Sequence, residues 1–420
     1  MYYTRKIEDI VKRISDTFPV LLITGPRQSG KTTLLRCLAG TDRCYVTLDD
    51  PDDRLFAKQQ PVAFLERYSP PVIIDEIQYA PELLPYIKMN VDTKKENGAF
   101  WLTGSQMFHM MKNVSESLAG RVGILNLFGL SNSEITGDLF DEYTTAPEKL
   151  LERLNSTRPM TLRDTFSRIH RGGMPRLYEQ TETDLDEYFS SYLQTYISRD
   201  IRDLIQVADE LAFYRFLRAA AARTASLINY EALARDTGVS APTAKQWLSV
   251  LVSSGVAFLI EPYHNNALKR VVKSPRFYFM DTGLAAYLTK WSNPDVLETG
   301  AMAGEFFETY VVSEIYKSFI NTGKTPPLFY YRDKNMKEID LIIWKDGTLY
   351  PIEIKKSSNP SESVKSFNAL DPVTCAKNHT EIPAYQKMEL GIGSIICQSN
   401  NLHPAQCSKS EVWVVPHWLI

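Results

Sequence analysis

The sequence predicts an α/β chain with a parallel-sheet domain at the N-terminus, a helical middle and a smaller mixed α/β domain at the C-terminus. Short apolar segments ending in polar or glycine residues recur in the first third, as is typical of buried parallel strands. The middle carries apolar residues at helical spacing, whereas KEIDLIIW and TLYPIEIKKS near the C-terminus alternate with strand period. A length of 420 residues suits roughly three domains. The predicted segments are 1–145, 146–215, 216–280 and 281–420.

Composition restricts the class of protein before any motif is considered. The chain is 44% hydrophobic and 23% charged, which excludes a disordered protein, and its net charge of -3 excludes wholesale coating of nucleic acid. Five scattered cysteines do not form a disulfide scaffold. No apolar run approaches the ~20 residues that cross a bilayer. We therefore expect a soluble cytoplasmic protein with no membrane partner.

A phosphate-binding loop follows the first predicted strand, residues 19–24. Strand, GPRQSGKT and helix occur in the order that a P-loop requires. Its glycines allow backbone N–H groups to converge on phosphates, Lys31 reaches the β- and γ-phosphates, and Thr32 holds Mg²⁺. The predicted ligands are therefore ATP and Mg²⁺. The residues predicted to contact the nucleotide are Gly25, Pro26, Arg27, Gln28, Ser29, Gly30, Lys31, Thr32 and Thr33.

Two acidic residues end the strand in PPVIIDEIQ, where open α/β sheets place their ligands. Asp75 is predicted to bind Mg²⁺ and Glu76 to polarise the attacking water. The strand in AFWLTGSQ ends in Ser105 and Gln106, either of which fits a γ-phosphate sensor, although a plain turn would look the same. Arg121 fits an arginine finger acting within the chain or in a neighbouring subunit, and equally fits a surface salt bridge.

Taken together, GPRQSGKT, VIIDEIQ, FWLTGSQ and SLAGR resemble AAA-type ATPases of bacteria and archaea that carry a C-terminal domain of unknown function. GGMPRLY, SYLQTYISRDIRDL, KSPRFYFMDTGLAAYL and IDLII…PIEIKKS fit the same resemblance. It implies an AAA/RecA-like P-loop fold and ATP hydrolysis, and covers nearly the whole chain. For the C-terminal domain it implies a fold without implying a reaction.

Residues 216–280 predict a winged helix behind a helical lid or connector. NYEALARDTGVSAPTAKQWLSVLVSSGV has helix–turn–helix spacing, which places Thr243, Lys245 and Gln246 on the exposed side of the second helix. The most basic short stretch then follows: Lys269, Arg270, Lys273 and Arg276. DNA contact is one interpretation. A packing module that contacts an unknown protein partner is the other.

The C-terminal domain carries two carboxylates and a lysine on two strands. A turn at residues 345–347 makes a hairpin that brings Asp340 alongside Glu353, and strand alternation places Lys355 on the same face as Glu353. This arrangement resembles the PD-(D/E)XK nuclease superfamily. Asp340 and Glu353 can bind Mg²⁺, Lys355 can position water, and Glu305, or Glu308 one turn on, can complete the site. A catalytically inactive nuclease-like scaffold remains the alternative, because a fold does not certify its chemistry.

Overall fold

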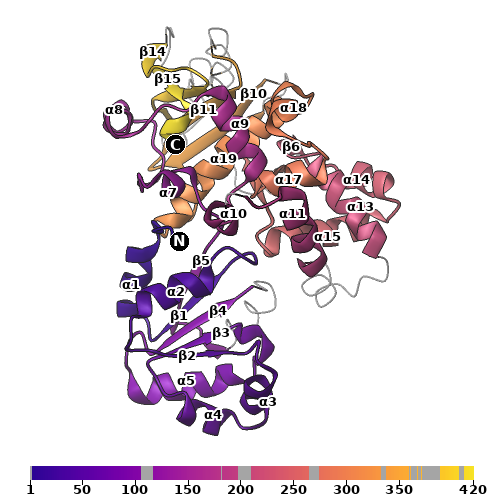
Figure 1. Cartoon of the computed structure of the whole chain (residues 1–420). Helices are drawn as coiled ribbons and strands as arrows, with labels where there is room; N and C mark the ends of the chain where they lie inside the picture. The colour runs from indigo at the N-terminus through magenta and orange to yellow at the C-terminus, as the bar shows by residue number, and fades with distance from the viewer. Residues whose placement is uncertain are drawn as a thin grey trace, which may run out of the picture.

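The computed structural model describes residues 2–105, 117–180, 182–196, 210–263, 274–332, 337–358, 388–405 and 411–420, together with Pro360, Phe367 and Leu370. The N-terminal domain forms one end of the molecule, and the remaining elements form a larger body above it (Figure 1). Among the described residues, no helix has the length and apolar character needed to cross a bilayer.

Five parallel strands form the centre of the N-terminal domain, in the order β2-β3-β4-β1-β5. Strand β1 lies between β4 and β5, so β4 separates it from β3. The elements of this domain are α1 (Glu8–Thr17), β1 (Val20–Thr24), α2 (Lys31–Ala39), β2 (Cys44–Thr47), α3 (Pro51–Gln59), α4 (Pro61–Arg67), β3 (Val72–Asp75), η1 (Ile77–Tyr79), α5 (Leu83–Lys94), β4 (Phe100–Gly104) and β5 (Val122–Asn126). The predicted parallel α/β fold is therefore confirmed for this domain.

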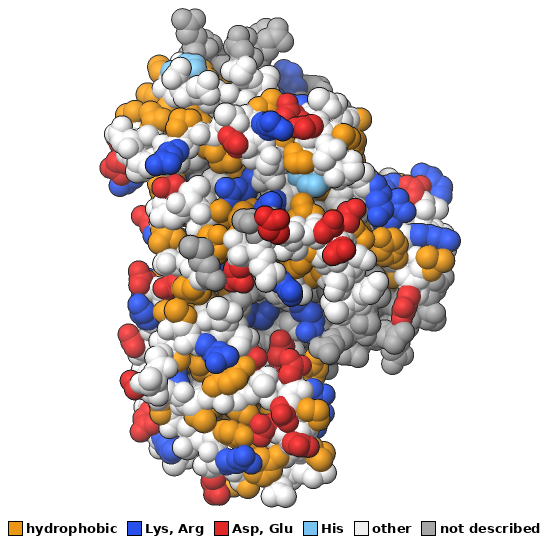
Figure 2. All heavy atoms as spheres, in the orientation of Figure 1, with side chains coloured by type: hydrophobic (Ala, Val, Ile, Leu, Met, Phe, Trp, Pro, Cys, Tyr) orange, Lys and Arg blue, Asp and Glu red, His pale blue; other side chains and the backbone are white. Residues whose placement is uncertain are grey.

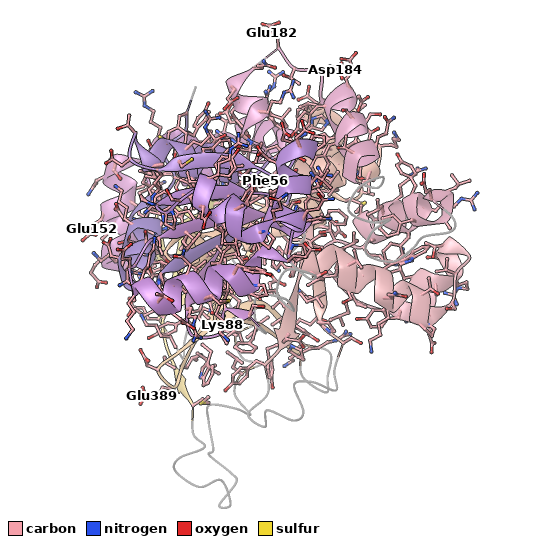
Figure 3. The ribbon with its side chains drawn as sticks, turned by 90° about the horizontal axis from the view of Figure 1, so that it is seen from below. Phe56, Lys88, Glu152, Glu182, Asp184 and Glu389 are labelled. Carbon is pink, nitrogen blue, oxygen red and sulfur yellow. The ribbon has the colours of Figure 1, made fainter. Side chains whose placement is uncertain are left out.

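Alternation along the strands separates the two faces of this sheet. Leu21 and Ile23 pack with residues of α1 and α2 on one face, whereas Val20 and Leu22 pack with residues of α3 to α5 on the other. Because both faces are covered, β1, β3 and β4 are buried along their whole length. In the view from below (Figure 3), Phe56 of α3 and Lys88 of α5 mark the outer side of this domain.

Helices dominate the middle of the chain, and a short antiparallel sheet joins them. The elements are α7 (Asn132–Thr136), α8 (Pro147–Ser156), α9 (Leu162–Arg171), α10 (Arg176–Glu179), α11 (Leu185–Tyr196), α13 (Glu210–Ala221), β6 (Ser226–Leu227), α14 (Tyr230–Thr237), α15 (Ala241–Ser253), β7 (Ala257–Pro262) and β8 (Arg276–Phe279). Strand β8 lies between β6 and β7. The order from α13 to β8 is that expected for a winged helix, whose assignment stays a prediction.

A mixed sheet and a long helix form most of the C-terminal part. The elements are α17 (Thr282–Leu288), α18 (Pro294–Thr299), α19 (Ala303–Asn321), β9 (Leu328–Arg332), β10 (Glu338–Lys345), β11 (Thr348–Lys355), β12 (Glu389–Leu390), β13 (Gly393–Cys397), β14 (His403–Ala405), β15 (Val412–Pro416) and η5 (His417–Leu419). Strands β10 and β11 form the predicted hairpin, with Lys345 paired to Thr348 across the turn.

The sheet does not stop at the predicted boundary between residues 280 and 281. Strand β7 pairs in parallel with β9, so the small sheet of β6, β8 and β7 continues into the C-terminal sheet. One hydrophobic cluster extends from Phe128 to Ile420 and includes residues of α13, α15 and α19. The predicted segments 216–280 and 281–420 are therefore continuous in both sheet and core.

Helix α19 connects this body to the N-terminal domain. Lys317 lies 2.5 Å from Glu314 and donates a hydrogen bond to the carbonyl of Leu130, and both side chains are 6% exposed. The second oxygen of Glu314 accepts the N–H of Asn132 at 2.7 Å. This buried ion pair therefore holds the segment that leaves β5 against α19.

We expect His417 to make the stability of the chain depend on pH. Its ring is buried between Thr165 Oγ1 (2.6 Å) and the Cys397 carbonyl, and burial lowers its pKa to about 4. Only the unfolded chain takes up a proton near the ordinary pKa of about 6.5, so this contribution is present at pH 7 and is lost as the pH falls toward 4. This shift in pKa corresponds to about 3 kcal/mol of unfolding free energy. Urea titrations at several pH values give the unfolding free energy of each variant. As the pH falls, it should decline less steeply for His417→Asn than for the exposed control His403→Asn. Equal slopes would contradict this account.

Candidate nucleotide site and acidic cluster

The loop between β1 and α2 has the backbone that its glycines predict. Gly25 has φ +143°, and a Cβ atom there would lie 2.1 Å from the carbonyl oxygen of Leu127. Gly30 has φ +92° and is the N-cap of α2. A side chain at either position would be strained, and at Gly25 it would also collide with the backbone directly after β5. The loop therefore turns tightly and directs the N-terminus of α2 toward the ligand position.

The polar groups of this loop are buried and suited to a phosphate. Lys31 is 6% exposed, and its Nζ donates to the carbonyls of Gly25 (3.0 Å) and Pro26 (2.8 Å). The hydroxyl of Ser29 is buried and has no hydrogen-bond partner among the described residues. Such a group is costly unless a ligand satisfies it. These observations fit a bound phosphate group.

Asp75 accepts hydrogen bonds from hydroxyl groups of two neighbouring strands, β2 and β4, and of α2. Its Oδ1 accepts hydrogen bonds from Thr32 (2.7 Å) and Thr103 (2.5 Å), and its Oδ2 accepts one from Tyr45 (3.2 Å). Burial, followed by the charge of Asp75, raises the pKa of Tyr45 to about 12, so this phenol stays a donor. Thr32 and Asp75 thus lie together with hard oxygen donors, and this donor set fits Mg²⁺.

Glu76 lies beside this group in an unusual conformation. Its φ of +57° is in the left-handed region, which non-glycine residues adopt at a cost and which clusters at functional sites. Its N–H donates to Thr103, while its carboxylate accepts from Gln78 and, at 3.3 Å, from Ser105. Ser105 is therefore at the strand tip and in contact with Glu76. Gln106, the other predicted sensor, lies outside the described residues.

Arg121 does not lie at this site. It precedes β5, and its carbonyl accepts the N–H of Val20 at the start of β1, whereas the P-loop follows the end of β1. Five residues of strand separate the two edges by about 16 Å. Its guanidinium pairs with Asp92 of α5 at 2.5 Å. The predicted contact within the same chain is therefore wrong, because Arg121 is at the opposite edge of the parallel sheet.

The P-loop faces the middle of the chain. The side-chain oxygen of Gln28 accepts a hydrogen bond from Tyr188 of α11 at 2.6 Å. A Cβ atom on Gly255, in the turn after α15, would lie 3.2 Å from Pro26, and one on Gly30 would lie 3.8 Å from Pro175. These contacts come from residues far apart in sequence. A nucleotide on this loop would therefore lie at the boundary between the two parts of the chain.

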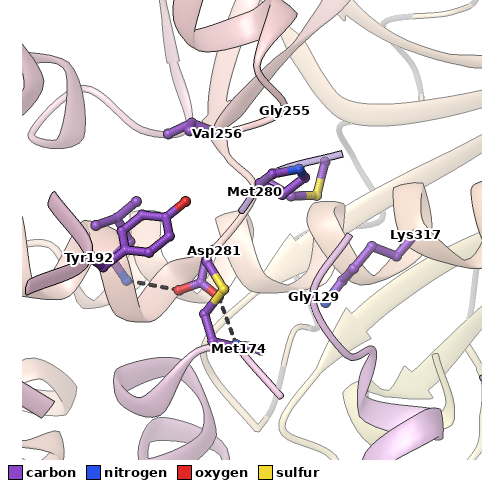
Figure 4. Close-up of a pocket in the computed structure, with 11 residues that line it drawn as sticks. Gly129, Met174, Tyr192, Gly255, Val256, Met280, Asp281 and Lys317 are labelled. Atoms are coloured by element: carbon purple, nitrogen blue, oxygen red, sulfur yellow. Dashed lines mark hydrogen bonds between the residues drawn. The ribbon is translucent and has the colours of Figure 1, made fainter. Parts of the chain in front are cut away.

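Figure 4 shows the junction behind the loop, where Asp281 accepts hydrogen bonds from the N–H groups of Gly173 (2.8 Å) and Leu284 (2.9 Å). Burial raises the pKa of Asp281. The cavity here measures only about 20 Å³, roughly one water molecule. Asp281 thus fastens the GGMP segment, residues 172–175, to the start of α17.

Sequence reasoning did not identify Arg5 as a support of the loop. Arg5 is 4% exposed and donates to the carbonyls of Ser29 (3.0 Å) and Phe128 (2.8 Å), while its Nε pairs with Glu134 at 3.0 Å. Gln78 and Tyr188 also went unrecognised. A buried arginine leaves no periodic signal in the sequence, because its partners come from distant segments.

A second polar site, which we call the acidic cluster, lies on α19, β10 and β11. It consists of Glu308, Glu338, Asp340 and Glu353. The hairpin brings Asp340 and Glu353 side by side, and Asp340 accepts the N–H of Ile354 at 2.9 Å. Lys355 lies 3.0 Å from Glu353 and 3.4 Å from Asp340. Although burial lowers the pKa of Lys355, the charges of Asp340 and Glu353 raise it above its ordinary value.

Glu308, and not Glu305, completes this cluster. Glu308 accepts hydrogen bonds from Tyr278 and Arg276, whereas no hydrogen bond or ion pair joins the Glu305 carboxylate to a residue that the structure describes. Helical rotation explains the difference, because only Glu308 points from α19 toward β8. Burial, followed by the charge of Asp340, raises the pKa of Glu308 to about 7.

Arg276 is also not placed as predicted. Its side chain is 8% exposed and reaches Glu308 (2.9 Å), Glu338 (2.5 Å) and Asp340 (3.6 Å). It therefore cannot contact DNA in this conformation. Lys269, Arg270 and Lys273 lie outside the described residues. On α15, Lys245 and Gln246 are exposed as predicted, while the hydroxyl of Thr243 lies 2.8 Å from the N-cap Ser240.

The acidic cluster does not fit a divalent metal as it stands. Within the described part of the chain, no three His, Cys, Asp or Glu side chains are arranged to hold a metal ion. The oxygens of Asp340 face Arg276, Lys355 and the N–H of Ile354. The predicted Mg²⁺ site at Asp340 and Glu353 is therefore not formed in this structure.

Comparison with known families supports the assignment of the N-terminal domain. Residues 17–136 match the model of an AAA domain (AAA_14). Residues 162–295 and 303–401 match two domains of unknown function, DUF8612 and DUF4143. The N-terminal domain is therefore similar to AAA-type P-loop domains. The other two matches describe no reaction.

Two mycobacterial proteins are similar along most of the chain. The uncharacterized proteins Mb2031c of Mycobacterium bovis and Rv2008c of Mycobacterium tuberculosis are each 28% identical over 382 residues, which cover 90% of this chain and 80% of each relative. The similarity to these relatives therefore extends over most of this chain and is not confined to the N-terminal domain.

Among solved structures, a Walker-type ATPase of Pyrococcus abyssi is 15% identical with a TM-score of 0.43, and the match covers 68% of this chain and 96% of that one. A RuvB variant of Thermotoga maritima is 18% identical with a TM-score of 0.27, covering 60% and 87%. Both TM-scores are below 0.5, the level at which a shared overall fold is established.

Proposed function

We propose that this protein binds and hydrolyses ATP with Mg²⁺, and that the nucleotide state sets how the AAA domain packs against the rest of the chain. The observation that carries the proposal is the group of Lys31, Thr32, Asp75 and Glu76 at one edge of the sheet, beside the unpartnered Ser29 hydroxyl. The AAA-domain match to residues 17–136 supports it.

Each residue has a distinct role in this scheme. The carbonyls that now accept from Lys31 keep its ammonium group within the loop, from where it would turn to the β- and γ-phosphates. Thr32 and Asp75, now hydrogen-bonded to one another, would hold Mg²⁺, Asp75 usually through water. Bound Mg²⁺ neutralises charge that develops on the phosphate oxygens.

Glu76 is the group that would orient and polarise the attacking water. Gln78 and Ser105 hold its carboxylate from one side, and its N–H is anchored on Thr103, which also binds Asp75. The water-activating group is thus linked to the metal-binding group through one threonine. Because Ser105 contacts the Glu76 carboxylate, it would sense the γ-phosphate indirectly, through the position of Glu76. Arg121 remains a candidate only for a neighbouring copy of the chain.

Two routes lead from the nucleotide to the rest of the molecule. One passes through the P-loop contacts with Tyr188 and Gly255. The other passes through the Lys317–Glu314 pair on α19, the helix whose first half carries Glu308 of the acidic cluster. Since α19 is continuous over 19 residues, a displacement of one end of the helix would also displace the other end.

Calorimetry with Mg-ATP and a phosphate-release assay test the proposal at the AAA domain. We expect binding with 1:1 stoichiometry and slow turnover. Absence of heat on titration would reject the nucleotide site. The same assay with duplex DNA, single-stranded DNA and RNA tests whether the winged-helix segment acts on nucleic acid. On the face in Figure 2, basic and acidic side chains are interspersed, so we do not expect a large stimulation.

Hydrogen exchange of residues 303–321 tests the coupling. We expect a difference between the Mg-ATP and Mg-ADP states in the native protein, because a ligand shifts a conformational equilibrium only by binding the two states differently. Glu314→Gln leaves Lys317 buried without its counter-ion and should cost about 3 kcal/mol of unfolding free energy. It should also abolish the exchange difference while ATP still binds.

The exposed pair Lys149–Glu152 provides the matched control for this variant. Glu152→Gln removes one carboxylate from a pair that is 65% and 66% exposed, so we expect a change within about 0.5 kcal/mol and an unaltered exchange response. Identical exchange of native α19 with both nucleotides would reject the coupling and would leave the ATPase assignment intact.

A further inference from the structure

Arg276 reaches the acidic cluster from a different part of the chain. It is the first residue of β8, in the segment matched by DUF8612, whereas the carboxylates belong to α19, β10 and β11. Its guanidinium lies 2.9 Å from Glu308, 2.5 Å from Glu338 and 3.6 Å from Asp340. One cation therefore bridges carboxylates from two elements at the place where the nuclease pattern predicts Mg²⁺.

Burial makes this bridge more than a surface salt bridge. The side chain of Arg276 is 8% exposed, those of Glu308 and Asp340 are 18% and 12% exposed, and Tyr278 donates a further hydrogen bond to Glu308. Charges at such sites are strongly destabilising unless each is paired. Arg276, Lys355 and Arg332 supply three positive charges against the four carboxylates.

We propose that the guanidinium of Arg276 takes the place of a divalent metal in the acidic cluster, so that this domain binds no metal at Asp340 and cleaves no nucleic acid there. The proposal concerns the C-terminal part alone and does not depend on the ATPase activity.

Two physical reasons make a metal and Arg276 mutually exclusive. A divalent ion at Asp340 would lie within a few ångströms of the guanidinium, where like charges repel strongly because water is largely excluded. The ion would also need oxygens of Asp340 that Arg276, Lys355 and Ile354 now occupy. Metal entry would thus require displacing the guanidinium of Arg276 from Asp340, although this side chain is buried.

The bridge also has a structural consequence. Arg276 joins β8 to α19 and β10, and Arg332 of β9 reinforces it by pairing with Glu338 at 2.9 Å. The small sheet of β6, β8 and β7 is thereby tied to the C-terminal sheet by charge as well as by the β7–β9 pairing. The cluster thus acts as a cross-link where the superfamily pattern would place catalysis.

Manganese binding to the nucleotide-free protein tests the proposal, with free Mn²⁺ measured by electron paramagnetic resonance. We expect that native protein and Asp340→Asn bind Mn²⁺ equally. Arg276→Gln should gain a site at least tenfold tighter than any native one, and the double variant Arg276→Gln, Asp340→Asn should lack it. The Asp340 dependence separates this site from the P-loop.

Two further variants identify which property of Arg276 matters. Arg276→Lys keeps a cation in the cluster and should gain no Mn²⁺ site. Arg332→Gln removes a cation that pairs with Glu338 at 2.9 Å, and should also gain none. Circular dichroism checks that each variant is folded.

These experiments can either support or overturn the proposal that Arg276 replaces a metal. A Mn²⁺ site in native protein that is lost in Asp340→Asn overturns the proposal, as does Mn²⁺-dependent DNA cleavage with the same dependence. A folded Arg276→Gln that gains no site also overturns it. If Arg276→Gln does not fold, the comparison of native protein with Asp340→Asn still decides, because equal Mn²⁺ binding supports the proposal and unequal binding refutes it.

Discussion

Replacement of Glu76 by glutamine is expected to leave Mg-ATP binding within about twofold of the native value and to slow hydrolysis at least about 100-fold, the usual contribution of a positioned general base. The amide is isosteric, so it preserves the contacts with Gln78 and Ser105 in outline but cannot accept a proton. Calorimetry and single-turnover phosphate release measure the two effects separately.

Ser105→Ala is the informative partner of Glu76→Gln. It removes one hydrogen bond to the Glu76 carboxylate and leaves the one from Gln78. Turnover should therefore fall by about fivefold, as expected for a positioning group whose net hydrogen bond is worth about 1 kcal/mol. Native turnover in Glu76→Gln would show that another residue activates the water.

Replacement of Lys31 by alanine is expected to weaken Mg-ATP binding at least about 100-fold. The ammonium group would form two or more charge-assisted hydrogen bonds to phosphate, each worth about 1.5–3 kcal/mol. The variant also leaves the carbonyls of Gly25 and Pro26 without this donor, which should loosen the loop. Titration calorimetry gives the change in Kd.

Lys12→Ala serves as the control for Lys31→Ala. Lys12 is an exposed lysine of α1 in the same domain, paired only loosely with Asp9 at 3.8 Å, so its loss should not alter nucleotide affinity. Native affinity in Lys31→Ala would reject the P-loop as the nucleotide site, and an equal loss in Lys12→Ala would point to net charge instead.

The nucleotide site of the N-terminal domain could be predicted because most of the residues that form it are close together in the sequence. Strand, loop and helix follow one another within residues 19–39, and the glycines that allow the loop are part of the same string. Asp75 and Glu76 were found because parallel strands deliver their carboxyl ends to one edge of a sheet. The β10–β11 register was equally accessible, since a two-residue turn and strand alternation set it.

Arg121 marks the limit of this reasoning. The edge at which this arginine lies depends on the direction of the strand that follows it, and the motif does not give that direction. The parallel pairing of β5 with β1 places it opposite the P-loop, where it meets Asp92. Similarly, the choice between Glu305 and Glu308 depends on the rotation of α19 against β8.

For this protein, residue order alone determined the phosphate loop, the paired carboxylates beside it and the hairpin of the C-terminal domain, because each depends on neighbours in the chain. Only the tertiary structure decided that Tyr188 meets the loop and that Arg276 occupies the acidic cluster. Periodicity tells which face of an element is buried. Which distant charge meets that face is settled by packing alone.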